Sequence, residues 1–217
     1  MKLIMKLVGS LSLTMWLSMV LIVSVEAQII DDTVYDSAGE ALQAGVEYYI
    51  RPAITDFGGR FTLIRRNDSC PYYVGQENSD PSDGYPVAFT PFEGGATVIK
   101  QSRDVKIEFQ GVGTICIQSS LAWLLGDRDP ITGRYLIATG EDTWIYPAGN
   151  YFRIEGTSMQ NVYSFRWCPT EVCPICRLIC QDVGPFVEDG KRLLALDGDR
   201  DFVFPVVFQK AQLTSTA

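Results

Sequence analysis

The six cysteines limit what this chain can fold into more than any other feature of its sequence. Four of them lie in one short stretch, WCPTEVCPICRLICQDVG (167–184), and the other two lie far upstream. Such a cluster binds a metal ion, carries redox chemistry or is joined by disulfide bonds. The choice depends on the redox compartment that the chain reaches, so we turn first to the N-terminus.

The N-terminus is typical of a secretory signal peptide. Two lysines precede an apolar run over residues 11–25, which ends in Val25-Glu26-Ala27 with small residues flanking the glutamate. This pattern predicts a signal peptide over residues 1–27 with cleavage after Ala27. A membrane anchor is the alternative, but the run is short for a span and no basic stop-transfer patch follows it.

We therefore expect residues 28–217 to form a single secreted domain. An oxidising compartment favours paired thiols, and an even number of cysteines leaves none over. Asn67 begins the sequon Asn-Asp-Ser in a polar stretch. We expect Asn67 to be a site of N-glycosylation.

The alternatives to disulfide bonds are weaker for this cluster. Structural zinc sites usually divide their ligands into two separated pairs, whereas these four cysteines follow one another closely. A redox CxxC site, here Cys173 and Cys176, usually begins a helix after a strand, and Pro174 opposes a helix at that point.

The spacing suits two nested disulfides, although six cysteines allow many other pairings. Cys168 with Cys180 would enclose the shorter bridge in a tight hairpin. The two remaining cysteines, Cys70 and Cys116, would then close a long loop, and such bridges stabilise a fold by restricting its unfolded chain.

The chain after the signal is rich in short β-type runs. Valine, isoleucine and aromatic residues alternate with turn signals such as Gly58-Gly59 and Asp189-Gly190, and no sustained helical period occurs. These runs predict an all-β barrel or sandwich. The predicted strands are residues 46–53, 60–66, 86–92, 105–110, 114–120, 134–140, 151–156, 162–167, 191–197 and 202–210.

The amino-acid composition argues against an enzymatic function. The chain has no histidine, which removes Ser-His-Asp and Cys-His catalysis and the commonest metal ligand. A glycine loop that would cradle phosphate is missing as well. The acidic groups 31–32 and 197–201 lie in turn-like or terminal segments, so we interpret them as solvated charge rather than a glycosidase pair. We expect a binding protein without cofactor or metal.

The negative net charge of the chain excludes some classes of binding partner. The formal net charge is −8, which argues against nucleic acid or an anionic membrane surface as partner. The basic dipeptides Arg65-Arg66 and Lys191-Arg192 are interpreted as solvated charge at strand ends.

Four segments, in order, resemble the plant Kunitz-type (soybean trypsin inhibitor) family, and most closely its miraculin-like branch. They are VYDSAGEALQAGVEYYIRPA (34–53), FGGRFTL (57–63), the cysteine cluster and KRLLALDGDRDFVFPVVFQK (191–210). The resemblance covers residues 30–210. It implies a disulfide-stapled β-trefoil, a six-stranded barrel capped by three hairpins. It also implies the pairs Cys70–Cys116, Cys168–Cys180 and Cys173–Cys176, a monomer and a protease as partner.

The resemblance also implies a substrate-like reactive loop within residues 89–104. Its central residues would be Thr90, Pro91, Phe92, Glu93 and Gly94. Glu93 takes the primary specificity position, where trypsin inhibitors carry Arg or Lys, and a glutamate would meet the carboxylate of trypsin's pocket. Ala44 replaces the asparagine whose side chain supports this loop in the family's inhibitors.

We therefore predict a secreted endopeptidase inhibitor, with a serine protease as the target, but not classical trypsin inhibition through Glu93. A shift of one residue would offer Phe92 to a chymotrypsin-like protease, and a longer loop would offer Lys100 or Arg103 to trypsin. Relatives that bind cysteine or aspartic proteases use other surfaces. The alternative function is a non-inhibitory binding, storage or stress-response protein on the same scaffold.

Overall fold

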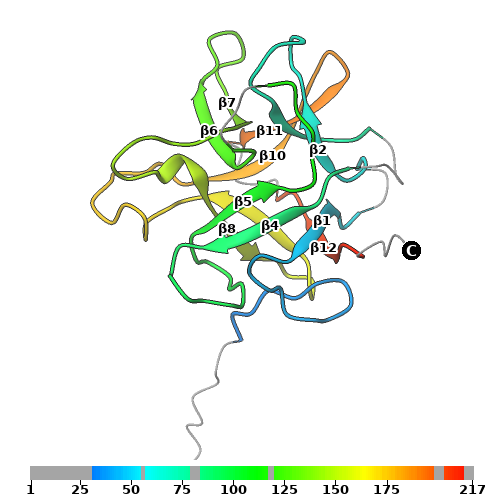
Figure 1. The fold of residues 1–217 in the computed structure, drawn as a ribbon, viewed down its shortest axis with the longest axis vertical. Helices are drawn as coiled ribbons and strands as arrows, with labels where there is room; N and C mark the ends of the chain where they lie inside the picture. Colours follow the sequence, from blue (N-terminus) through cyan, green and yellow to red (C-terminus); the bar gives the residue numbers. More distant parts are fainter. Residues whose placement is uncertain (1–30, 55–56, 79–83, 117–119, 198–202, 213–217) are drawn as a thin grey trace, which may run out of the picture. The chain divides into compact units, whose positions relative to one another are not determined.

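The computed structural model describes residues 31–54, 57–78, 84–116, 120–197 and 203–212, and the predicted signal peptide lies outside them. The described residues form twelve strands and a single turn of 3₁₀ helix (Figure 1). No helix among these residues is long and apolar enough to span a membrane. The elements are β1 (Glu47–Pro52), β2 (Phe61–Ile64), β3 (Tyr73–Gln76), β4 (Val87–Pro91), β5 (Val105–Phe109), β6 (Trp123–Arg128), β7 (Tyr135–Thr139), η1 (Ala148–Asn150), β8 (Tyr151–Gly156), β9 (Tyr163–Trp167), β10 (Gln181–Glu188), β11 (Lys191–Asp197) and β12 (Val206–Lys210).

Six of the strands close into a barrel. Antiparallel pairing runs from β12 through β1, β4, β5 and β8 to β9. Val206 of β12 then pairs with Tyr163 of β9, which returns the ladder to its first strand. A closed ladder leaves no free strand edge, so this ring is the predicted six-stranded barrel.

The other six strands form three hairpins, β2–β3, β6–β7 and β10–β11. The second strands of the hairpins pair with one another, as β11 meets both β3 and β7, and β3 meets β7. Each third of the chain thus supplies two barrel strands and one hairpin. This is the β-trefoil that the resemblance implies, although its internal repeat is not visible in the sequence.

The barrel interior is filled by alternate side chains of its strands. On β5, Val105, Ile107 and Phe109 are buried while the residues between them are partly exposed, as the period of two in a strand requires. Trp123 of β6 is buried, and its ring centroid lies 5.1 Å from that of Phe165 on β9. Such aromatic packing supplies much of the apolar area buried in a core.

The strand prediction is largely confirmed, and each of the three missed strands contains a glycine. Residues 114–116 are not a strand, and the predicted segment around them extends outside the described residues. The three strands missed, β3, β6 and β10, contain Gly75, Gly126 and Gly184. A Cβ at Gly75 would lie 2.3 Å from Ile64 Cδ1 and 2.5 Å from the Arg192 carbonyl oxygen. Close strand packing therefore requires glycine at this position of β3.

All six cysteines are joined in disulfides, so no thiolate is left to bind zinc and the zinc alternative is wrong. Cys173 and Cys176 lie in the turn between β9 and β10, not at the start of a helix where redox CxxC sites usually lie. The bonds are Cys70–Cys116, Cys168–Cys180 and Cys173–Cys176, the pairs that the resemblance implies. The first ties the β2–β3 connection to the segment after β5, and the other two lie between β9 and β10.

An ionic cluster joins the three hairpins. Arg66 follows β2, Asp129 follows β6 and Glu188 ends β10. Arg66 Nε and Nη2 donate to the two carboxylate oxygens of Glu188 at 2.5 and 2.7 Å, and Nη1 donates to Asp129. The Lys191 ammonium donates to the Arg65 and Arg66 carbonyl oxygens at 2.8 and 2.7 Å. The interpretation of Arg66 and Lys191 as solvated charge is therefore wrong.

Replacing Arg66 by Met should remove this link between the hairpins. Two largely buried carboxylates would then face each other without a cation, so we expect the free energy of unfolding to fall by about 2 kcal/mol at pH 7. Arg65→Met is the matched control, because Arg65 contacts the exposed Asp68 at 3.5 Å, and exposed pairs contribute less than about 1 kcal/mol. Equal losses in the two variants in urea denaturation would contradict this role of the cluster.

The difference in stability between wild type and Arg66→Met should become smaller at acid pH. Hydrogen bonds from Arg66 hold the pKa of Asp129 and the pKa of Glu188 below their usual ranges. A carboxylate with a lowered pKa stabilises the fold above its unfolded-state pKa, and this contribution is lost as the pH falls through the folded-state value. The difference between wild type and Arg66→Met should be full at pH 7 and should shrink below about pH 4.

Candidate functional site

The predicted reactive loop is the β4–β5 connection, and its two ends are held together. Thr90 and Pro91 are the last residues of β4, and Phe92 begins the connection. The Phe92 N–H donates to the Asp104 carbonyl oxygen at 2.8 Å, one residue before β5. The loop thus leaves the barrel and returns to it through an antiparallel pair.

The C-terminal limb of the loop is supported by backbone hydrogen bonds. The Val34 N–H donates to the Ile99 carbonyl oxygen at 3.0 Å, and the Ile99 N–H donates to Leu42 at 2.9 Å. The Ala44 N–H donates to the Thr97 carbonyl oxygen at 2.9 Å. The N-terminal segment therefore supports the loop with its main chain at Ala44, where the resemblance led us to expect an asparagine side chain.

The tip of the loop is a closed turn. The Ala96 N–H donates to the Glu93 carbonyl oxygen at 3.3 Å, and Gly95 has a φ of 83°. A turn over four residues with a positive φ at its third position favours glycine there. Glu93 and Gly94, which flank the predicted scissile bond, therefore begin a turn.

Arg103 pairs with two glutamates at this tip. Its Nη2 lies 2.9 Å from Glu93 Oε2, and its Nε lies 2.5 Å from Glu171 Oε1. The charge of Glu171, and less strongly that of Glu93, raises the pKa of Arg103. Arg103 is thus occupied within the molecule, and the charge of Glu93 is compensated before any partner arrives.

Asp104 fixes the base of the loop to the disulfide segment. Its buried carboxylate accepts from the Glu171 and Val172 N–H groups at 2.7 and 3.0 Å and from Arg153 Nε at 2.6 Å. The Asp104 N–H in turn donates to Glu171 Oε2 at 2.8 Å. No local sequence pattern points to Asp104 or Glu171, because their partners lie far away along the chain.

The other predicted site residues are also placed by the structure. Phe92 is 42% exposed, and its ring meets Tyr151 edge to face with 5.4 Å between centroids. Lys100 Nζ lies 3.1 Å from Asp32 Oδ1, so neither basic candidate is unpaired. Asn67 is exposed on the β2–β3 connection, away from the reactive loop.

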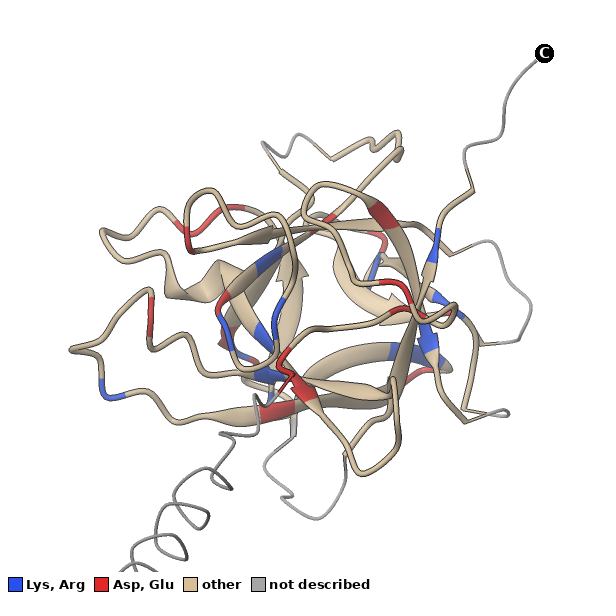
Figure 2. Ribbon diagram, turned by 90° about the horizontal axis from the view of Figure 1, so that it is seen from below, with Lys and Arg blue, Asp and Glu red and all other residues tan. Residues whose placement is uncertain are grey.

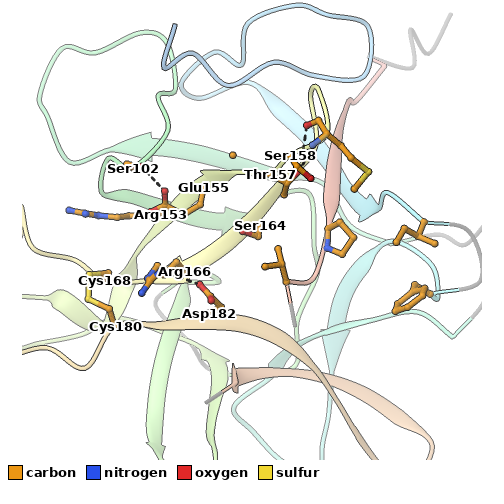
Figure 3. Close-up of a pocket in the computed structure, with 16 residues that line it drawn as sticks. Ser102, Arg153, Glu155, Thr157, Ser158, Ser164, Arg166, Cys168, Cys180 and Asp182 are labelled. Carbon is orange, nitrogen blue, oxygen red and sulfur yellow. Dashed lines mark hydrogen bonds and ion pairs between the residues drawn. A yellow bond between two sulfur atoms is a disulfide. The ribbon is translucent and has the colours of Figure 1, made fainter. Parts of the chain in front are cut away.

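A cavity of about 720 Å³ lies beside the barrel, against β8, β9 and the start of β10 (Figure 3). Its charged side chains pair with their neighbours: Arg166 lies 3.7 Å from Asp182, and Ser102 donates to Glu155 at 2.5 Å. Figure 2 likewise shows acidic and basic residues interspersed over the described chain. The cavity therefore offers no concentrated charge to a ligand.

The chain is similar to known proteins over most of its length. A family model described as trypsin and protease inhibitor, of the Kunitz legume type, matches residues 34–210. Kunitz type trypsin inhibitor 104 of Medicago truncatula is 45% identical over 179 residues, which are 82% of this chain and 87% of that protein. Miraculin of Synsepalum dulcificum is 32% identical over 179 residues, which are 79% of this chain and 80% of that protein.

A solved structure matches as well. The Kunitz-type cysteine protease inhibitor PCPI-3 from potato superposes with a TM-score of 0.69 at 28% identity, covering 84% of this chain and 99% of that chain. This match confirms the predicted fold.

Replacing Asp104 by Ala should release the base of the reactive loop. The variant leaves Arg153 and two backbone N–H groups without their acceptor, so we expect a loss of about 3 kcal/mol in the free energy of unfolding. Amide exchange of residues 92–103 should also become faster than in wild type. Arg103→Met is the control, because this half-exposed side chain should contribute less than about 1 kcal/mol. Unchanged exchange in Asp104→Ala would mean that the loop is fixed by other contacts.

Proposed function

The chain belongs to the Kunitz-type family of trypsin and protease inhibitors, and we propose that it is itself an endopeptidase inhibitor that acts through residues 89–104. The family model describes protease inhibitors rather than enzymes. The observation that carries the proposal is the exposed β4–β5 connection, which the main chain of the N-terminal segment and the Asp104 network hold at both ends. A loop ordered during folding loses little conformational entropy when a partner binds it.

The proposed target is a serine endopeptidase with a large apolar specificity pocket. The names of the relatives include trypsin inhibitors and a cysteine protease inhibitor, so family membership leaves the target class open. Glu93 would bring a like charge to trypsin's acidic pocket. Its carboxylate would also have to break its ion pair with Arg103 to enter that pocket. Phe92 is the partly exposed apolar side chain at the start of the loop, and it suits a chymotrypsin-like pocket.

A non-inhibitory binding protein is the second candidate, and the closed tip favours it. A protease cleft binds an extended peptide backbone, whereas Glu93 and Ala96 are bridged by a turn hydrogen bond. Ala44 also adds no side-chain support beneath this turn. The similarity to miraculin shows that family membership extends beyond proteins named as inhibitors.

The proposal includes the route out of the cell. The predicted signal peptide over residues 1–27 would deliver a single domain, residues 28–217, to the apoplast or vacuole as a monomer. The exposure of Asn67 supports its use as a glycosylation site, since an acceptor asparagine must be accessible.

A protease panel tests the proposed function. The mature protein should inhibit chymotrypsin and leave trypsin active, and Phe92→Ala should weaken chymotrypsin inhibition by about 30-fold or more. Glu93→Arg should create trypsin inhibition, because an arginine there would be repelled by Arg103 and turn toward solvent.

Tyr135→Ala serves as the control for Phe92→Ala, since Tyr135 on β7 is similarly exposed. If micromolar protein leaves chymotrypsin, trypsin, a papain-like and a pepsin-like protease fully active, the inhibitor proposal is wrong and the non-inhibitory candidate replaces it.

A further inference from the structure

The β7–β8 connection presents three consecutive large apolar side chains to solvent. Trp144 is 79% exposed and Ile145 is 88% exposed, and the adjoining Tyr146 is partly exposed. Figure 1 shows this yellow-green connection projecting beyond the strands of the barrel. Burying a side chain of this size stabilises a protein by roughly 1.5–3 kcal/mol, yet the fold leaves these side chains outside its core.

A buried asparagine holds the two ends of this connection together. Asn150 Nδ2 donates to the Trp123 and Gly140 carbonyl oxygens at 2.7 and 2.9 Å. Its Oδ1 accepts from the Asp142 N–H at 2.6 Å. One side chain therefore ties the first residues of the connection to its last residue and to β6.

Asp142 forms a second tie closer to the tip. Its Oδ1 accepts from the Trp144 N–H at 3.0 Å, and its Oδ2 accepts from the Gly149 N–H at 2.8 Å. A Cβ at Gly149 would lie 2.9 Å from Asp142 Oδ2 and 3.0 Å from Leu124 Cδ1. The glycine is therefore required for this close approach.

The charges at the foot of the connection are compensated. Glu141 accepts from Lys106 Nζ at 2.9 and 3.1 Å, and both carboxylate oxygens of Asp142 accept backbone N–H groups. The tip formed by Trp144 and Ile145, which we call the aromatic tip, thus presents apolar surface on an ordered base whose charged groups are hydrogen-bonded within the molecule. Its complement is an uncharged apolar surface on a partner.

The foot of this connection also adjoins the reactive loop. Asn150 is followed by Tyr151, whose ring packs against Phe92. Lys106 of β5, two residues beyond Asp104, reaches Glu141. A protein that binds at Phe92 covers roughly 800 Å² of surface, which extends well beyond a single loop.

We propose that the aromatic tip is a second anchor for the endopeptidase that binds at Phe92, and that it docks on an apolar surface beside the protease's substrate cleft. This inference rests on the proposed function. Exposed tryptophan on an ordered base is typical of residues that dominate interface energetics. The hydrogen bonds of Asn150 and Asp142 order this connection when the protein folds, so that little conformational entropy remains to be lost when a partner binds.

Inhibition constants for chymotrypsin test the second anchor. Trp144→Ala and Ile145→Ala should each weaken inhibition by about 10-fold or more, mainly through faster dissociation. Ile131→Ala is the matched control, because Ile131 is 87% exposed on the β6–β7 turn, and it should leave inhibition unchanged. Asp142→Ala should also weaken inhibition, although it retains both anchor side chains, because it removes the hydrogen bonds that order the connection. Asp142→Asn keeps one acceptor oxygen and should weaken inhibition less.

The outcomes separate this inference from the proposed function. If Phe92→Ala weakens inhibition while Trp144→Ala and Ile145→Ala do not, the second anchor is wrong and the proposed function stands. If the wild-type protein inhibits no protease, the proposed function falls and the anchor falls with it. Concentration-dependent dimers in sedimentation that Trp144→Ala abolishes would instead assign the tip to self-association and overturn the inference.

Discussion

The fold depends on closure of the barrel where β9 meets β12. Val206 pairs with Tyr163 at this seam, and every barrel strand thereby has a partner on both sides. Tyr163 also accepts, through its hydroxyl oxygen, a hydrogen bond of 2.8 Å from the Tyr35 N–H. The N-terminal segment that docks there is the one whose main chain supports the reactive loop. Tyr163 therefore takes part both in closing the barrel and in holding the N-terminal segment that supports the loop. A connection that leaves a closed barrel also has both of its ends fixed by paired strands.

Two neighbouring connections are ordered by different means on this scaffold. The β4–β5 loop relies on backbone pairing along one limb and on the Asp104 network at its base. The β7–β8 connection relies on two side chains, Asn150 and Asp142, that span it from within. Backbone pairing depends little on which side chains the paired limb carries, although the turn at the tip favours glycine at position 95. The side-chain tie in the β7–β8 connection requires Asp142 itself and a glycine opposite it. The two connections should consequently differ in how freely their sequences vary.

The sequence predicted the architecture better than the site. Nearly all β-rich runs became strands, and the order of short motifs identified the family, because strand patterning is local. Among the strands that were missed, β3 contains Gly75, a residue type depleted in strands, which lies where β2 and β11 approach too closely for a side chain. Asp104 could not be found from sequence, since its partners are distant in the chain. Asn150 was missed because a buried polar residue looks like a loop residue in a sequence. Arg66 was misread for the same reason, as its two acceptors belong to other hairpins.

Glu93, at the tip of the β4–β5 loop, is linked to the rest of the molecule through a chain of polar contacts. Glu93 contacts Arg103, Arg103 contacts Glu171, and Glu171 donates its N–H to Asp104 at the base of the loop. A change of charge at position 93 therefore alters the surroundings of Arg103. The other partner of Arg103 is Glu171, which lies in the segment that carries the two disulfides. The Cys168–Cys180 and Cys173–Cys176 bonds limit how far that segment can respond. Because the disulfides hold Glu171 in place, Arg103 keeps one acceptor when Glu93 turns toward a partner, and the loop can exchange an internal ion pair for an external contact without losing its base.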